Sequence, residues 1–358
     1  MMRKLLLLSF VLGGLLFAGN VSAQDIHFSQ FYMSPLNLNP AMTGVMNCKM
    51  RFTANYRNQW APVLKDAAFN TYNISYDQKV PVGRYDYVGF GGTVWADKAG
   101  SLDFSTTALK LSFAYSKRMG GSRTSAQYLV LGADGGINQR SVNFQNAQFG
   151  SQAVNGEFDG TLSSGETLID ESFSFGDISA GLLWFNIIDE NNNFYIGAAF
   201  HHLNQANQSF YSNQIAELYT KTTIHAGGEF EMSPRVRLVP GIVTFLQGPS
   251  LEVNGGTSLR FLLGNSRFYN QSFQAGAWLR LANRYIAPET VNGQSSTGIL
   301  ADAVILSTRF DYDNFGIGFS YDINISNLAA DQSNGAFEFS LIYNICGPER
   351  RGVYCPNF

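Results

Sequence analysis

Apolar and polar residues alternate with a period of two along most of the chain from Met50 to Ile345. The first such run places apolar or aromatic side chains on one face: Met50, Phe52, Ala54 and Tyr56. Its other face is polar and carries Arg51, Thr53, Asn55 and Arg57. Because successive side chains of a β-strand point to opposite faces, this pattern predicts strands with one apolar and one polar face.

The same pattern recurs between turn residues and predicts about fourteen strands. We expect them at residues 50–57, 71–77, 87–96, 106–117, 127–138, 175–187, 194–203, 220–230, 235–245, 251–263, 272–281, 303–312, 315–325 and 336–345. An even number of such strands is typical of an all-β, antiparallel transmembrane barrel of the outer membrane. An open sheet would leave edge N–H and C=O groups unpaired in lipid, at several kcal/mol each, so we expect the first strand to pair with the last.

The connections between strands give an independent indication of topology. The long ones are 140–174, 204–219 and 282–302, and the tightest are 189–193, 231–234 and 313–314. Outer-membrane barrels have short periplasmic turns and longer extracellular loops. With both termini in the periplasm, all three long connections face outward and all three tight turns face inward. The short outer connection 247–250 departs from this trend.

The first 23 residues have the composition of a secretory signal peptide. Arg3 and Lys4 precede an apolar run that ends at Ala18, and Val21-Ser22-Ala23 offers a small-residue cleavage site. The run is too short for a membrane-spanning helix, which needs about 20 apolar residues. We therefore expect export to the outer membrane of a Gram-negative cell. The expected parts are a signal peptide (1–23), an irregular periplasmic segment (24–49), the barrel (50–345) and a periplasmic tail (346–358).

Composition supports a membrane protein over a soluble enzyme. Charged residues make up 14% of the chain, against roughly 25% in ordinary soluble domains. Gly (36), Tyr (17) and Phe (29) are abundant, and capped stripes with helical periodicity are almost absent. The net charge of −3 and the lack of a basic cluster exclude nucleic acid as a partner class.

Twelve charged residues are predicted to face the barrel interior: Arg51, Arg57, Asp77, Lys110, Asp134, Glu229, Arg260, Arg280, Arg309, Asp311, Asp322 and Glu338. They could line a selective pore, or they could form a ladder of ion pairs that braces the wall. The second interpretation is favoured, because polar interiors are general in such barrels. The interior could also be filled by a plug or by the N-terminal segment.

The histidines are candidates for a metal-binding or hydrolase site. His201, His202 and His225 lie in predicted strands, with Ser209 and Ser212 as candidate nucleophiles. Adjacent strand residues point to opposite faces, so we expect 201 and 202 not to bind one ion. No carboxylate and serine share a recognisable spacing with these histidines. We predict no enzyme activity, no catalytic residue, no metal and no cofactor.

Two polar runs, Asp97–Gly100 and Asp189–Asn193, are predicted to be solvated turns. Calcium binding at the second is the less favoured interpretation.

The three cysteines are Cys48, Cys346 and Cys355. Cys48 lies just before the first predicted strand and Cys346 just after the last, so a closed barrel brings these ends together. A bond from Cys48 to Cys346 or Cys355 would staple the seam, whereas Cys346 to Cys355 would close only a small tail loop. We expect a disulfide that involves Cys48, with its partner undecided by the sequence.

Four sequence motifs resemble the PorP/SprF family. They are Gln-Asp-Ile-His-Phe-Ser-Gln-Phe-Tyr-Met-Ser-Pro-Leu-Asn-Leu-Asn-Pro-Ala-Met-Thr-Gly (24–44), Tyr-Arg-Asn-Gln-Trp (56–60), Asp-Lys-Ala-Gly (97–100) and His-Leu-Asn-Gln (202–205). They are spread over most of the chain in the family's order. Ala206 stands where the family usually has proline after the last motif.

This resemblance implies an outer-membrane component of type IX secretion and gliding motility. Its partners would be outer-membrane lipid and either the C-terminal domain of a large secreted adhesin, held by the outer loops or the lumen, or periplasmic secretion components. It supplies no catalytic residues. A diffusion pore or lipophile transporter is the second hypothesis, and a membrane-embedded hydrolase is the third.

The N-terminal segment is the candidate partner-binding region. It lacks strand alternation and is rich in aromatic residues and proline, so it must either tuck into the barrel mouth or meet a periplasmic partner. Packing of a mere leader tail on its own barrel is about equally compatible with the sequence. The candidate partner-binding residues are Phe28, Gln30, Phe31, Tyr32, Pro35, Asn39 and Pro40.

Overall fold

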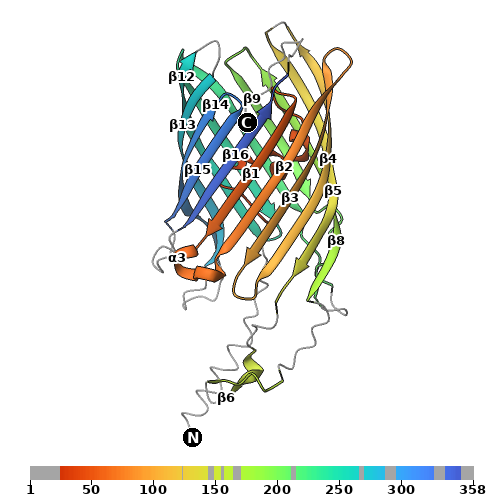
Figure 1. Ribbon diagram of the computed structural model, residues 1–358, viewed down its shortest axis with the longest axis vertical. Coiled ribbons are helices and arrows are strands. Elements are labelled where there is room, and N and C mark those ends of the chain that lie inside the picture. The colour runs from red at the N-terminus through yellow and green to blue at the C-terminus, as the bar shows by residue number, and fades with distance from the viewer. Residues whose placement is uncertain are drawn as a thin grey trace.

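Fourteen antiparallel strands close into one barrel in the computed structural model (Figure 1). The described residues are 25–122, 124–143, 149–154, 157–163, 171–210, 215–265, 270–286, 296–325 and 335–347. The predicted fold class is therefore confirmed, and each strand lies where the period-two pattern places it. The predicted signal peptide and Cys355 lie outside the described residues.

The barrel strands follow one another in chain order around the ring. They are β1 (Met50–Gln59), β2 (Phe69–Val82), β3 (Asp86–Ala99), β4 (Phe104–Gly121), β5 (Ala126–Ser141), β8 (Ser172–Ile187), β9 (Asn193–His201), β10 (Lys221–Ser233), β11 (Val236–Gln247), β12 (Ser250–Asn265), β13 (Asn270–Ile286), β14 (Ser296–Tyr312), β15 (Phe315–Asn324) and β16 (Ala336–Ile345). The short strands β6 (Ala153–Val154) and β7 (Glu157–Phe158) pair with each other in the connection between β5 and β8.

The helical elements among the described residues are short. They are η1 (Phe31–Met33), α2 (Pro35–Leu38), η2 (Pro40–Met42), α3 (Ala61–Leu64), η3 (Lys65–Ala67) and η5 (Gly150–Gln152). None of the helices in the described part of the chain has both the length and the apolar character needed to cross a membrane.

The first and last strands close the ring. β1 pairs with β16 over its whole length, from Met50 opposite Ile345 to Gln59 opposite Ala336. In Figure 1 the two strands lie side by side at the front of the barrel. Alternation along β2 is as predicted: Tyr72 and Ile74 are exposed on the outside, and Asn73 is buried inside. The outward apolar side chains are available to lipid, while the inward polar ones meet the lumen.

The two ends of the barrel differ in their connections. Tight turns join the strands at one end, which we call the periplasmic mouth, and longer segments such as 60–68, 142–171 and 202–220 leave from the other, the outer mouth. The names follow the rule that outer-membrane barrels have short periplasmic turns. In Figure 1 the outer mouth is at the bottom, where α3 lies. The connection between β11 and β12 is short, as expected.

Several strands are longer than the sequence pattern predicts. The expected loop 282–302 shrinks to 287–295, because β13 and β14 continue to pair as far as Ile286 opposite Ser296. Backbone pairing remains favourable beyond the lipid layer, where side-chain alternation is no longer required. The run Asp97–Gly100, expected as a turn, is strand up to Ala99 for the same reason, with Asp97 opposite Thr71.

A disulfide joins Cys48 to Cys346 across the seam between β1 and β16. The two cysteines directly flank the paired strands, and the backbone N–H of Lys49 donates to the carbonyl of Ile345 at 3.0 Å. This confirms the expectation that Cys48 forms a disulfide and selects Cys346 as its partner. The bond therefore fastens the chain entering the first strand to the chain leaving the last.

We expect Cys48→Ser to lower the thermal stability of the barrel, because the disulfide ties residues 298 positions apart in sequence. Loss of a native disulfide typically costs about 2–5 kcal/mol. The measurement is the temperature at which the folded band converts to the unfolded band in SDS gels, with and without reductant. Cys355→Ser is the control and should melt like the wild type. Identical melting of oxidised and reduced wild type would contradict the expectation.

Candidate functional site in the barrel lumen

Residues 25–47, which we call the plug, run through the lumen from one mouth to the other. At the periplasmic mouth the plug is followed by Cys48 and its disulfide. At the outer mouth, the backbone N–H of Asp25 donates to the side chain of Gln247, the last residue of β11, at 2.8 Å. The plug contains η1, α2 and η2, and Pro35 and Pro40 each occupy the first position of a helical turn, where proline is favoured.

The plug and inward side chains of the wall form the apolar core together. Phe31 and Tyr32 pack against Trp278 on β13, with ring centroids 5.6 and 5.7 Å apart. Met33 and Met42 are fully buried. The plug thus adds apolar side chains to an interior that also contains many polar wall residues.

Glu338 on β16 binds two consecutive backbone groups of the plug. The N–H of Ser29 donates to one carboxylate oxygen at 2.7 Å and the N–H of Gln30 to the other at 2.9 Å. The hydroxyl of Ser29 donates to Asp322 at 2.7 Å. Asp322 also accepts from Arg57 at 3.0 Å and from Arg280 at 2.7 Å. This buried cluster satisfies backbone donors of the plug that have no strand partner.

Asn39 holds the middle of the plug against the wall. Its side-chain oxygen accepts from the N–H of Ala41 at 2.8 Å and so caps η2. Its side-chain nitrogen donates to the carbonyl of Leu182 at 3.0 Å and lies 3.0 Å from Nε2 of His225. Because an amide N–H₂ only donates, Nε2 of His225 is the acceptor. His225 therefore binds the plug.

The last part of the plug is fixed by Asp77 and Arg51, which form a buried ion pair at 2.8 Å. Asp77 accepts from the N–H of Gly44 at 2.8 Å. Arg51 donates to the carbonyl of Met42 at 3.2 Å. One wall ion pair thus binds both a donor and an acceptor of the plug backbone.

Inward glycines make room for the plug. A Cβ atom at Gly89 would overlap the carbonyl of Thr43, and one at Gly132 would overlap the backbone of Ala41. At Gly181 it would overlap the side chain of Asn39. Glycine is required at these positions because the backbone of the plug approaches the backbone of the wall closely.

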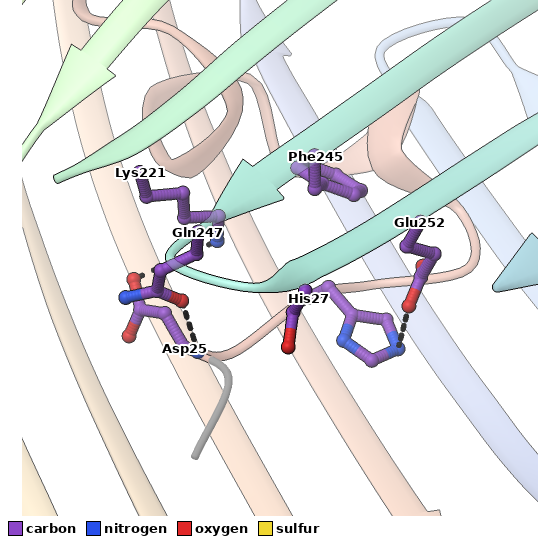
Figure 2. Close-up of a pocket in the computed structure, with 7 residues that line it drawn as sticks. Asp25, His27, Lys221, Phe245, Gln247 and Glu252 are labelled. Atoms are coloured by element: carbon purple, nitrogen blue, oxygen red, sulfur yellow. Dashed lines mark hydrogen bonds and ion pairs between the residues drawn. The ribbon is translucent and has the colours of Figure 1, made fainter. Parts of the chain in front are cut away.

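The outer end of the plug is held by charged residues, and Figure 2 shows Asp25, Lys221 and Gln247 converging there. Asp25 lies 3.1 Å from His202 and 3.6 Å from Lys221. Lys221 also donates to the carbonyl of Ile26 at 2.9 Å. His27 points away toward Glu252, 3.7 Å distant (Figure 2). We call the contacts of Asp25 with His202, Lys221 and Gln247 the outer latch.

The electrostatics of the outer latch favour its charged form. Burial would raise the pKa of Asp25, but Lys221 and His202 lower it well below the usual 3.8. Burial would lower the pKa of His202, but Asp25 and the hydrogen bond to Asp177 raise it to about 8. The pKa of His27 is well below 6.5, because of burial and the nearby Arg57 and Arg280. Asp25 and His202 are therefore both ionised at neutral pH.

The predicted inward charges all lie in buried or half-buried ion pairs, as expected of a braced wall. The pairs are Arg51–Asp77, Arg57–Asp322, Arg57–Glu338, Lys110–Asp134, Arg260–Glu229, Arg280–Asp322 and Arg309–Asp311. Sequence reasoning missed Asp177 and Glu252, which pair with Lys110 at 2.7 Å and Arg280 at 3.6 Å. Both residues occupy positions that alternate with the outward apolar residues of β8 and β12, and this alternation could have identified them as inward-facing.

The candidate partner-binding residues all lie inside the lumen. Phe28, Gln30, Phe31, Tyr32, Pro35, Asn39 and Pro40 are buried. The structure brings them together as parts of the plug, in contact with the protein's own barrel. The segment 24–49 was expected in the periplasm, at most tucked into the barrel mouth. Its described part instead extends through the lumen to the outer ends of β10 and β11, because wall side chains bind its backbone along the way.

The expectation for the adjacent histidines is wrong in its geometry. β9 ends at His201, and His202 has a positive φ of 59°. The strand rule no longer applies there, so both side chains are buried. Within the described residues, no group of three or more His, Cys, Asp or Glu side chains is arranged to hold a metal ion. Ser212, one candidate nucleophile, lies outside the described residues.

The turn Asp189–Asn193 is built as predicted. Asp189 accepts from the backbone N–H groups of Asn191 and Asn192, both at 2.8 Å. These side-chain contacts are the ordinary chemistry of an Asx turn.

We expect Gly132→Val to displace the plug, because the new side chain would occupy the space of Ala41. Overpacking of this kind typically costs about 1–3 kcal/mol, and ion conductance in planar bilayers should rise above the wild-type level. The control is Gly135→Val on the same strand. A Cβ there meets only the carbonyl of Asp177, at 3.9 Å. Equal conductance and equal stability of both variants would contradict a close plug–wall fit.

We expect the stabilising effect of His202 to depend on pH. The folded-state pKa is raised, so the contribution is complete below the unfolded value of 6.5 and is lost as pH rises through about 8. The difference in urea midpoint between wild type and His202→Gln should therefore shrink across this interval. His27→Gln is the control, because His27 is neutral throughout. A constant difference for His202→Gln would contradict the latch.

Comparison with solved structures finds outer-membrane barrels at low sequence identity. CdiB from Acinetobacter baumannii is 10% identical with a TM-score of 0.40, and the match covers 82% of this chain and 60% of that one. The CymD monoaromatic hydrocarbon channel is 13% identical with a TM-score of 0.44, covering 92% and 96%. The TodX monoaromatic hydrocarbon channel, a deltaS2 mutant, is 11% identical with a TM-score of 0.44, covering 88% and 94%.

No curated protein sequence matches the chain significantly. The family described as "Type IX secretion system membrane protein PorP/SprF" matches it over residues 20–343. This range includes the plug and nearly all of the barrel, up to two residues before the end of β16. The chain therefore belongs to the PorP/SprF family of outer-membrane proteins of type IX secretion.

Proposed function

We propose that the protein is a closed outer-membrane barrel that anchors a large cell-surface adhesin or assists its export, or couples to periplasmic parts of the secretion machinery. The observation that carries this proposal is the plug, which occupies the lumen from the outer latch to the disulfide. A barrel filled in this way is suited to holding partners at its mouths.

The contacts inside the lumen argue against a standing diffusion pore. The wall charges that would select ions are paired with one another and with the plug backbone, as at Glu338 and Asp77. Two small cavities lie beside the plug, and plug residues line both. Asp25 and His27 stand in the first, and Phe31 and Tyr32 in the second.

The outer connections are the surface that we assign to an adhesin's C-terminal domain. The lumen, which the family resemblance leaves as an alternative place, is occupied by the plug. Apolar side chains are exposed in the outer connections: Val63 is 45%, Leu203 47% and Ile215 80% exposed. These three residues lie outside the barrel strands. They are suited to burial against a protein.

The test is affinity purification of the tagged protein from membranes, followed by mass spectrometry. We expect a large adhesin or periplasmic secretion components to be recovered. The triple variant Val63→Asp, Leu203→Asp, Ile215→Asp should reduce adhesin recovery at least tenfold, corresponding to about 1.4 kcal/mol of binding. Thr161→Asp in another exposed outer connection is the matched control. Recovery of the wild type alone, together with steady single-channel conductance, would support a diffusion pore instead.

A further inference from the structure

We propose that the plug is a strap through the whole lumen, which the chain enters at Asp25 at the cell-surface mouth and leaves at Cys48 at the periplasmic mouth. This inference concerns the path of the chain and does not require the proposed adhesin role. It places the N-terminal end of the plug, Asp25, at the outer mouth of the barrel.

Three hydrogen bonds show where successive parts of the plug lie along the barrel axis. Near the periplasmic mouth, Lys79 donates to the carbonyl of Met46 at 2.8 Å. Halfway along β1, Asn55 donates to the carbonyl of Met33 at 3.2 Å. Ser29 is bound by Glu338, close to the outer end of β16.

Asp25 completes the series at the outer mouth. It contacts the last residue of β11, the first residue of β10, and His202 just after β9. All three positions are at strand ends from which the outer connections leave. The two ends of the plug therefore lie at opposite mouths of the barrel, Cys48 following it at the periplasmic mouth and Asp25 at the outer mouth.

The outer latch holds this end in place. Three side chains from separate parts of the wall bind Asp25, and Lys221 also binds the next carbonyl. A chain that returned to the periplasm from here would have to run through the lumen a second time. That path is already filled by Phe31, Met33 and Met42, which are at most 3% exposed. Asp25 therefore marks the outer end of the strap.

The outer latch lies next to the outer connections that we assign to partner binding. His202 belongs to the connection 202–220, whose exposed apolar residue Ile215 is part of the surface assigned to a partner. The outer end of the strap, Asp25, would thus lie beside the connection 202–220 that belongs to this surface. The C-terminal side leaves at the opposite mouth, after Cys346.

The experiment is labelling of single cysteines on intact cells with a membrane-impermeant biotin maleimide. Gln24→Cys is made in a Cys355→Ser background, which retains the native disulfide. Val63→Cys in the same background reports the outer side, and Thr124→Cys, exposed in the tight turn between β4 and β5, reports the periplasmic side. We expect Gln24→Cys to label like Val63→Cys without permeabilisation, and Thr124→Cys to label only after the outer membrane is permeabilised.

Labelling of Gln24→Cys only after permeabilisation would overturn the strap. If the thiol is shielded under both conditions, or the variant does not form the heat-modifiable barrel, a short epitope inserted between Ala23 and Gln24 replaces it. Antibody binding to this epitope on intact cells would support the proposal. Detection of the epitope only after permeabilisation would count against the proposal. Loss of barrel assembly with this epitope, but not with the same epitope at the C-terminus, would also count against it. Failure to find an adhesin leaves these readouts unchanged.

Discussion

Pairing of every backbone polar group within lipid is the constraint on which the structure depends. An unpaired N–H or C=O costs several kcal/mol in the bilayer, and only closure of the sheet removes both edges at once. The pairing of β1 with β16 achieves this, and the disulfide between Cys48 and Cys346 fastens the same seam. Because side chains alternate along each strand, a ring with an apolar outside necessarily has its other residues inside.

That interior creates the second requirement, since a ring of this size is wider than its own side chains can fill. Buried charges are costly unless they are paired and hydrogen-bonded. The plug meets both conditions, because its aromatic residues pack against Trp278 and its backbone N–H groups bind Glu338 and Asp77. The wall and the plug are therefore complementary parts of one core, and glycines such as Gly132 shape the wall to fit it.

The plug also relates the fold to function. A lumen closed along its length leaves the two mouths as the places where partners can bind, and it connects them physically. The outer latch is the weaker end of the plug, since it relies on ionisable side chains, whereas the periplasmic end is covalent. The two ends of the plug are consequently held by unequal interactions.

Much of the candidate site was visible in the sequence as parts. Side-chain alternation along each strand identified the inward-facing charged residues. Closure of the barrel predicted a disulfide of Cys48 across the seam, although the sequence did not distinguish Cys346 from Cys355 as its partner. The segment 24–44 stood out by its motif, its aromatic residues and its prolines. Its place was not predictable, because a segment without strand or helix periodicity carries no local information about which surface it will meet. The predicted orientation of the His202 side chain was wrong, because its positive φ places it outside strand geometry, where neighbouring side chains no longer alternate between faces.

The sequence by itself determined the barrel, its strand positions and the face to which each strand residue points. The reason is that bilayer and backbone impose a period of two, which is a local property and can be read residue by residue. Only the tertiary structure decided which charges pair, which cysteine closes the seam and where the N-terminal segment lies. Those outcomes depend on distances across the lumen between residues such as Ser29 and Asp322, 293 positions apart, and no local pattern encodes them.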